Sequence, residues 1–234
     1  MKPSVQQTRP YRYYELVMAA FVVVLICSNL IGPAKIAQIT LPHLGAVTFG
    51  AGVLFFPISY VFGDILTEVY GFARARRVIW TGFAMMILAS LTFIAVGALP
   101  SAPDWGGQAA YETILGLTPR IVAASILAYF CGEFLNSFVL AKLKIATAGR
   151  WLWLRTISST LVGEGVDTVL FVVVAFWGVL PPALLATIIV SNYVFKVGIE
   201  ALFTPVTYWL AGFLKRKEGI DHFDRNTRFN PFTP

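Results

Sequence analysis

Acidic side chains occur at helical spacing inside stretches that are otherwise apolar. The segment from Phe56 to Gly71 reads FPISYVFGDILTEVYG, with Asp64 and Glu68 four positions apart. In a helix, this spacing places both carboxylates on one face. A charge at the centre of a bilayer costs about 2.5–3.5 kcal/mol on insertion scales, so it must pair, become neutral or meet water. Acids in such positions are therefore candidates for a functional site.

Other polar residues in apolar stretches are also spaced three or four positions apart. They are Glu133 and Asn136, then Glu164 and Asp167, then Asn192, Lys196 and Glu200. Counting about 1.5 Å per residue places Lys196 and Asp167 near the middle of the membrane. We predict that these residues, together with Asp64, form a polar layer between helices that binds a small solute. A purely structural ion pair, such as Lys196 with Asp167, is the alternative.

Glu68 lies near the end of its apolar stretch, just before a group of arginines. These are Arg74, Arg76 and Arg77. Charges at the membrane interface are inexpensive, so an ion pair there is readily formed. We predict that Glu68 pairs with one of these arginines, either as part of an inner gate or as a structural contact.

The composition is that of a membrane protein. Of the 234 residues, 57% are hydrophobic and only 13% are charged, whereas a soluble domain has about 25% charged residues. Six stretches approach the roughly 20 apolar residues that a membrane helix needs. They cover residues 13–31, 47–69, 78–98, 119–140, 155–179 and 183–214. The prediction is an all-α fold, with residues 1–234 forming a single domain of six transmembrane helices.

The basic residues are distributed unevenly among the connections. Fifteen of the 18 Lys and Arg residues fall on one side of a six-span arrangement. Basic connections stay in the cytoplasm, so both termini are expected there. The net charge of +6 is then an orientation signal, and we expect the lipid bilayer, not nucleic acid, as the partner.

The sequence lacks the motifs of common enzyme classes. It has no G-x-S-x-G, H-E-x-x-H or G-x-x-x-x-G-K-[ST] pattern, which are the signatures of serine hydrolases, zinc proteases and ATPases. The two cysteines and two histidines are scattered and form no recognisable metal-binding pattern. We therefore expect no enzymatic activity, no cofactor and no metal.

Five segments resemble the queuosine precursor transporter family, an integral membrane family formerly grouped under vitamin uptake. They read SNLIGPAK at 28–35, FPISYVFGDILTEVYGFARAR at 56–76, STLVGEGVDTVLF at 159–171, NYVFKVGIEALFTPVTY at 192–208 and FDRNTRFNPF at 223–232. The resemblance implies import of 7-cyano- and 7-aminomethyl-7-deazaguanine across the bacterial plasma (inner) membrane by a stand-alone secondary transporter. It also implies a six-helix fold similar to the substrate-binding subunits of energy-coupling-factor vitamin transporters.

The polar layer suits such a substrate. A guanine-like edge presents an N–H and an NH₂ side by side, and one carboxylate can accept from both. Lys196 or Asn192 could donate to the ring carbonyl. An alternative is a substrate-binding subunit of an ATP-driven energy-coupling-factor-type importer of a vitamin or nucleobase, which no sequence feature excludes. A homodimer is a further possibility for so small a transporter.

Overall fold

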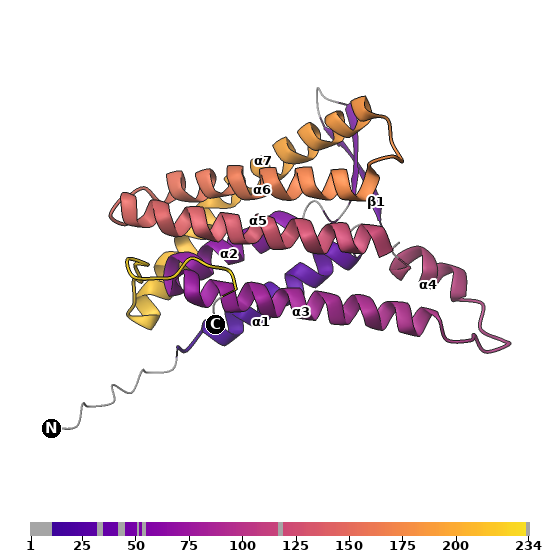
Figure 1. Cartoon of the computed structure of the whole chain (residues 1–234), viewed down its shortest axis with the longest axis horizontal. Coiled ribbons are helices and arrows are strands. Elements are labelled where there is room, and N and C mark those ends of the chain that lie inside the picture. The colour runs from indigo at the N-terminus through magenta and orange to yellow at the C-terminus, as the bar shows by residue number, and fades with distance from the viewer. Residues whose placement is uncertain are drawn as a thin grey trace.

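The computed structural model describes residues 11–31, 35–41, 45–50, 52, 55–116 and 119–232, and helices make up most of them. In chain order the elements are α1 (Tyr14–Ile26), the π-helical turn η1 (Cys27–Ile31), β1 (Ile36–Leu41), β2 (Gly45–Gly50), α2 (Phe56–Tyr70), α3 (Phe72–Gly97), α4 (Gln108–Leu115), α5 (Pro119–Ala146), α6 (Leu152–Phe176) and α7 (Pro182–Glu218). The long helices α3, α5 and α6 run along the longest axis of the molecule (Figure 1).

Several helices are suited to a membrane by length and composition. Among the described residues, four stretches are long and apolar enough to cross one: Phe72–Gly97, Gln108–Ala146, Leu152–Phe176 and Pro182–Glu218. The apolar helix Tyr14–Asn29 is shorter, and α2 has only 15 residues. Large apolar side chains point outward, as at Leu202, which is 78% exposed, and Trp209, which is 65% exposed. Apolar groups on the outside fit a protein surrounded by lipid.

The expected second span, 47–69, is not a continuous helix. Its beginning belongs to β2, which pairs with β1 in an antiparallel hairpin, and α2 starts only at Phe56. The β-branched and aromatic residues Val47, Thr48 and Phe49 favour a strand. Pro57 lies in the first turn of α2, where proline is well tolerated. The expected all-α class is therefore correct for the bundle but overlooks this hairpin.

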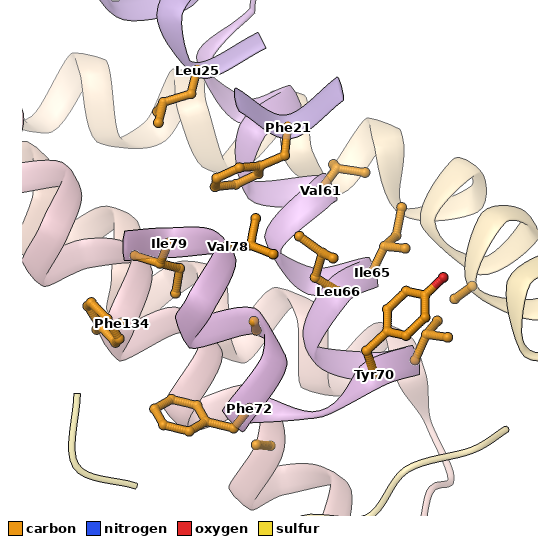
Figure 2. Close-up of a cluster of buried hydrophobic side chains, with 14 of the residues drawn as sticks. Phe21, Leu25, Val61, Ile65, Leu66, Tyr70, Phe72, Val78, Ile79 and Phe134 are labelled. Carbon is orange, nitrogen blue, oxygen red and sulfur yellow. The ribbon is translucent and has the colours of Figure 1, made fainter. Parts of the chain in front are cut away.

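Helix α2 is the central element, and most of its residues are buried. One face is apolar: Val61, Ile65 and Leu66 pack with Phe21 of α1 and Val78 of α3 (Figure 2). Burying a side chain of this size contributes about 1.5–3 kcal/mol. The apolar face thus holds α2 against α1 and α3, and its polar residues are left to meet α5, α6 and α7.

A single glycine separates α2 from α3. Gly71 has a φ of +85°, a conformation that glycine adopts readily and other residues avoid. The ring of His222 packs against it: a Cβ built on Gly71 would lie 2.1 Å from His222 Cδ2. The chain therefore changes direction abruptly, and the arginines of α3 leave the face of α2 that carries its acids.

The residues after α7 close one end of the bundle. Asp224 accepts a hydrogen bond from the backbone N–H of Phe72, and Trp80 donates its indole N–H to the carbonyl of Pro231. The start of α1 is fixed at the same end, because Glu218 accepts from the backbone N–H groups of Arg12 and Tyr13. We call this end, which also carries the α2–α3 and α5–α6 connections, the basic end (Figure 1).

Candidate functional site

An ion triad joins α6 and α7 inside the bundle. The Nζ atom of Lys196 lies 2.5 Å from Oδ2 of Asp167 and 3.1 Å from Oε2 of Glu164. The ring of Phe56, from the start of α2, stands 3.8 Å from the same amine. All three charged side chains are buried. Helical spacing predicted that Lys196 would share the depth of these acids, and one amine indeed bridges both.

Glu133 of α5 lies beside this triad without a partner. Its side chain is fully buried, and among the described residues neither carboxyl oxygen has a hydrogen-bond partner. A Cβ built on Gly63 of α2 would lie 1.8 Å from its Oε1, so the carboxyl group occupies space that only glycine leaves free. The nearby hydroxyl of Tyr60 is also buried and has no hydrogen-bond partner in the part of the chain that the structure describes. Both groups can therefore bind a polar ligand without first breaking a protein contact.

A line of polar contacts continues from Glu133 along the interface of α2 and α5. Asn136 donates to Asp64 over 2.7 Å, and Thr67 donates to Ser137 over 3.0 Å. Two of the predicted site residues, Asp64 and Asn136, are thus buried in this α2–α5 seam and bound to one another, while Oδ1 of Asn136 has no partner among the described residues. The seam leads from the central acids toward the basic end.

Glu200 lies one helical turn beyond Lys196 on α7 and faces α6. It is buried, and its Oε1 is hydrogen-bonded to the hydroxyl of Thr160. A small pocket opens beside it, whose polar lining is Glu200 with Thr156, Thr160, Thr204 and Thr207. Asn192 lies one turn from Lys196 in the other direction and is only partly buried. No hydrogen bond or ion pair joins Asn192 to the acids within the described residues.

The predicted pairing of Glu68 with Arg74, Arg76 or Arg77 is wrong. Glu68 forms a bidentate contact with Arg155 of α6, with N–O distances of 2.6 and 3.2 Å. Lys215 of α7 lies 2.5 Å from its Oε1, and Lys144 of α5 lies 3.5 Å away. Glu68 is thus a fully buried acid shared by three other helices.

The turn at Gly71 is the reason that the arginines of α3 do not reach Glu68. Arg74 donates instead to the carbonyl of Tyr70. Arg76 donates to the carbonyls of Arg228 and Asn230 in the C-terminal tail. Arg77 is exposed.

Sequence reasoning missed Arg155, although a signal was present. The predicted span 155–179 begins at Arg155, which suggests a residue at the membrane interface. Yet Arg155, Ser159 and Gly163 follow one another at four-residue intervals, next to the face that bears Glu164. This polar stripe begins at Arg155, which places its side chain inside the bundle and not in the interface.

Asp221 extends the Glu68 network into the tail. It accepts from Lys144 over 2.6 Å and lies 2.9 Å from Lys215. Partial burial would raise the pKa of Asp221, but the hydrogen bonds and positive charges of these two lysines outweigh it and hold the pKa below its usual value. In this network, therefore, both acids and all three cations have an opposite charge within ion-pair distance.

The described residues contain no group of three or more His, Cys, Asp or Glu side chains placed to hold a metal ion. The central acids are instead arranged around one lysine amine and an unpartnered carboxyl group. Such an arrangement can accept hydrogen bonds from an organic ligand and exchange one cationic partner for another.

Comparison with known proteins identifies relatives. Residues 50–210 match the family described as "Putative vitamin uptake transporter". The chain is 34% identical over 189 residues to a probable queuosine precursor transporter of Bacillus subtilis strain 168, covering 78% of each chain. It is 34% identical over 156 residues to a queuosine precursor transporter of Escherichia coli K12, covering 65% of this chain and 67% of the relative. No solved structure matches the chain.

The matched region contains every residue of the central acid layer. Together with the long apolar helices, these relatives identify the chain as a multi-pass membrane protein, not an enzyme. The resemblance found in the sequence is thereby confirmed: the chain belongs to the putative vitamin uptake transporter family, among relatives named queuosine precursor transporter.

Proposed function

We propose that this protein imports the queuosine precursors 7-cyano- and 7-aminomethyl-7-deazaguanine across the bacterial plasma (inner) membrane as a stand-alone secondary transporter. The names of the two relatives support the substrate class. The observation that carries the proposal is the buried, unpartnered carboxyl group of Glu133 beside the Lys196 triad. A polar layer inside an apolar bundle is the usual position of a transporter's substrate site.

In this proposal the membrane is crossed six times, within a single domain over residues 1–234. The crossing segments are α1 with η1, then α2, α3, α5, α6 and α7. The hydrogen bonds of Glu218 to the start of α1 support termini on one side of the membrane. The cations gathered at the basic end favour the cytoplasm for that side.

In this proposal, Glu133 binds the guanine-like edge of the substrate. The ring N–H and the exocyclic NH₂ of a 7-deazaguanine are adjacent donors, and the two oxygens of one carboxylate match them. Glu133 lies directly over Gly63, so no side chain of α2 at that position separates its carboxyl group from the helix backbone. A ligand lacking either donor would leave a buried oxygen unsatisfied, at a cost of about 1–3 kcal/mol.

The Lys196 triad would contact the ring carbonyl or the aminomethyl group of the substrate. The amine of Lys196 could donate to the ring carbonyl if it left one of its two acids. In the aminomethyl substrate, the substrate's own cation could replace Lys196 beside Asp167 or Glu164. In either case binding rearranges the contact that holds α6 to α7, which links occupancy of the site to movement of helices.

Uptake into liposomes tests this function. Purified protein in liposomes without ATP should take up radiolabelled 7-cyano-7-deazaguanine, and excess unlabelled 7-aminomethyl-7-deazaguanine should compete. Uptake only after an ATPase partner is added would instead support the energy-coupling-factor-type importer. If the protein is folded in the vesicles and exchanges neither compound across the membrane, the proposed function is wrong.

A further inference from the structure

The central layer holds more acid than its cation can balance. Among the described residues it contains five buried carboxyl groups, on Asp64, Glu133, Glu164, Asp167 and Glu200, and the single amine of Lys196. That amine is already engaged by Asp167 and Glu164. A buried carboxylate without a cation is so costly that the group normally takes up a proton instead. The layer must therefore hold protons when no substrate is bound.

The hydrogen bonds around Glu200 offer a place for one of these protons. The Thr160 hydroxyl is hydrogen-bonded both to the backbone carbonyl of Thr156, at 2.8 Å, and to Oε1 of Glu200. A hydroxyl has one hydrogen, and a carbonyl oxygen can only accept. If Thr160 donates to Thr156, the hydrogen of the second bond must come from Glu200. Glu200 is then a neutral acid that donates to Thr160.

No described residue forms an ion pair with Glu200. Carboxyl groups face it from three helices: Asp64 on α2, Glu133 on α5 and Glu164 on α6. On its own helix, Lys196 is turned toward Asp167 and Glu164. An ionised Glu200 would therefore stand among like charges in a dry interior, where such repulsion is strong.

A pocket lined in part by threonine hydroxyls lies beside Glu200 and could accept its proton. Oε2 of Glu200 has no hydrogen-bond partner among the described residues, and the threonine pocket lies beside it. The pocket hydroxyls of Thr204 and Thr207 donate to backbone carbonyls of their own helix, which leaves their oxygens as acceptors. The pocket extends from Glu200 to Thr156, near the first turn of α6, and so points toward the basic end.

We propose that Glu200 is the proton-binding residue that couples uptake to the proton gradient. Resting on the proposed function, we name the proton as the driving ion: the carboxylate of Glu200 takes up a proton from outside, stays neutral while the substrate passes, and releases the proton to the inside through the threonine pocket. Glu133 and the Lys196 triad bind the substrate, and Glu200 carries the proton.

Infrared spectroscopy tests the proton without any substrate. In purified wild-type protein, the C=O stretch of a protonated carboxylic acid should be present and should lose intensity in Glu200→Gln. The matched control Glu112→Gln, which alters an exposed glutamate of α4, should leave the band unchanged. Thr160→Val should shift the band because the acid loses its acceptor, and Thr160→Ser should restore its position. An identical band in wild type and Glu200→Gln would overturn the proposal.

Accumulation in liposomes tests the coupling. With the membrane potential clamped to zero, an inward proton gradient should make wild-type protein accumulate radiolabelled 7-cyano-7-deazaguanine about tenfold per pH unit, for one proton per substrate. In Glu200→Gln the ratio of inside to outside concentration should stay near one, while Glu200→Asp and Glu112→Gln should respond to the gradient. Exchange of labelled for unlabelled substrate in the wild type, with no response to the gradient, would refute proton coupling and leave the proposed function intact. Absence of exchange would refute the proposed function, and the infrared band would still decide where the proton lies.

Discussion

The central layer and the basic end are both buried polar clusters, but they are balanced in opposite ways. In the central layer, acids outnumber the single lysine. At the basic end, cations outnumber acids: Glu68 and Asp221 are surrounded by Lys144, Arg155 and Lys215. At the basic end, Glu68 and Asp221 each lie within ion-pair distance of at least two cations, whereas Glu133 and Glu200 in the central layer have none within the described part of the chain.

We infer from this difference that the basic end has a structural role and that the central layer is the candidate site. Glu68 contacts residues of α5, α6 and α7, so its charge holds four helices together at one end. Its carboxyl oxygens are already bound to cations, so a ligand could bind there only by displacing one of them. The central acids can change partners, because some of their oxygens are free and one amine is shared between two acids. We therefore expect damage at the basic end to appear as loss of folding, and damage in the central layer to appear as loss of transport.

The largest effect is expected from Glu68→Gln. The substitution leaves Arg155 buried without its acid, and breaking a buried ion pair in this way costs about 3–5 kcal/mol. Thermal unfolding of the purified protein in detergent should show a much lower midpoint. The exposed Glu112→Gln is the matched control and should unfold like the wild type. Equal stability of the two variants would contradict the structural role of the basic end.

Lys196→Met should reduce uptake by about 10–100-fold, because a charged hydrogen bond contributes about 1.5–3 kcal/mol. Since Lys196 contacts two acids, a double change with Asp167→Asn still leaves Glu164 uncompensated. The decisive variant combines Lys196→Met, Glu164→Gln and Asp167→Asn, which removes all three charges together. If the triad serves only to hold helices, this triple variant should transport normally. If the triad binds substrate, the variant should insert in the membrane and remain inactive, as uptake normalised to membrane protein would show.

Gly63→Ala tests the position of Glu133 with a single methyl group. The new Cβ would lie 1.8 Å from Oε1 of Glu133, so the carboxyl group must move away. Misplacing one recognition group should reduce uptake about tenfold, with membrane insertion unchanged. Gly198→Ala is the matched control, because a Cβ at that helical glycine meets no atom within 4 Å. Equal uptake by the two variants would remove Glu133 from the proposed site.

The polar layer could be predicted because it rests on helical periodicity. Glu164 and Asp167 share a face by spacing alone, and the depth of Lys196 follows from the length of its apolar stretch. The expense of burying charge then requires that such residues meet. The ends of α6 and α7 lie within four residues of the predicted spans, whereas α3 begins six residues earlier and α5 ends six residues later than expected, and the start of α2 was not predicted. In that span, the first residues favour a strand and form β2, so the helix starts later than expected, at Phe56.

The polar stripe of α6 indicates that Arg155 is buried, but the identity of its partner could not be predicted, because the contact between Arg155 and Glu68 depends on tertiary packing. Arg74 was close in sequence, but the positive φ of Gly71 directs it elsewhere. Arg155 lies 87 positions from Glu68 and reaches it only because α6 packs beside α5 near α2. The tail is a similar case: nothing in the sequence around Asp221 or Asp224 indicates that they bind Lys144 or the backbone of Phe72.

The smallest effect, at the edge of the basic end, concerns Asp221. Its side chain is 46% exposed, so its ion pairs with Lys144 and Lys215 are partly screened and together should contribute no more than about 1 kcal/mol. Its pKa in the folded protein is lowered, beneath the value of about 3.9 for an unfolded aspartate. Such a group stabilises the fold above the unfolded pKa, and this contribution is lost as the pH falls through the folded pKa.

Asp221→Asn should therefore lower the unfolding midpoint slightly at pH 7, and the difference from wild type should begin to shrink below about pH 4 and vanish once the pH is below the lowered pKa of Asp221 in the folded protein. Asp104→Asn, at an exposed aspartate before α4, should show no difference at either pH. Both comparisons use thermal unfolding in detergent across a pH series. A destabilisation by Asp221→Asn as large as that by Glu68→Gln would show that the tail, and not the buried acid of α2, is the main clasp of the basic end. A difference that persisted at low pH would mean that Asp221 acts through packing and not through its charge.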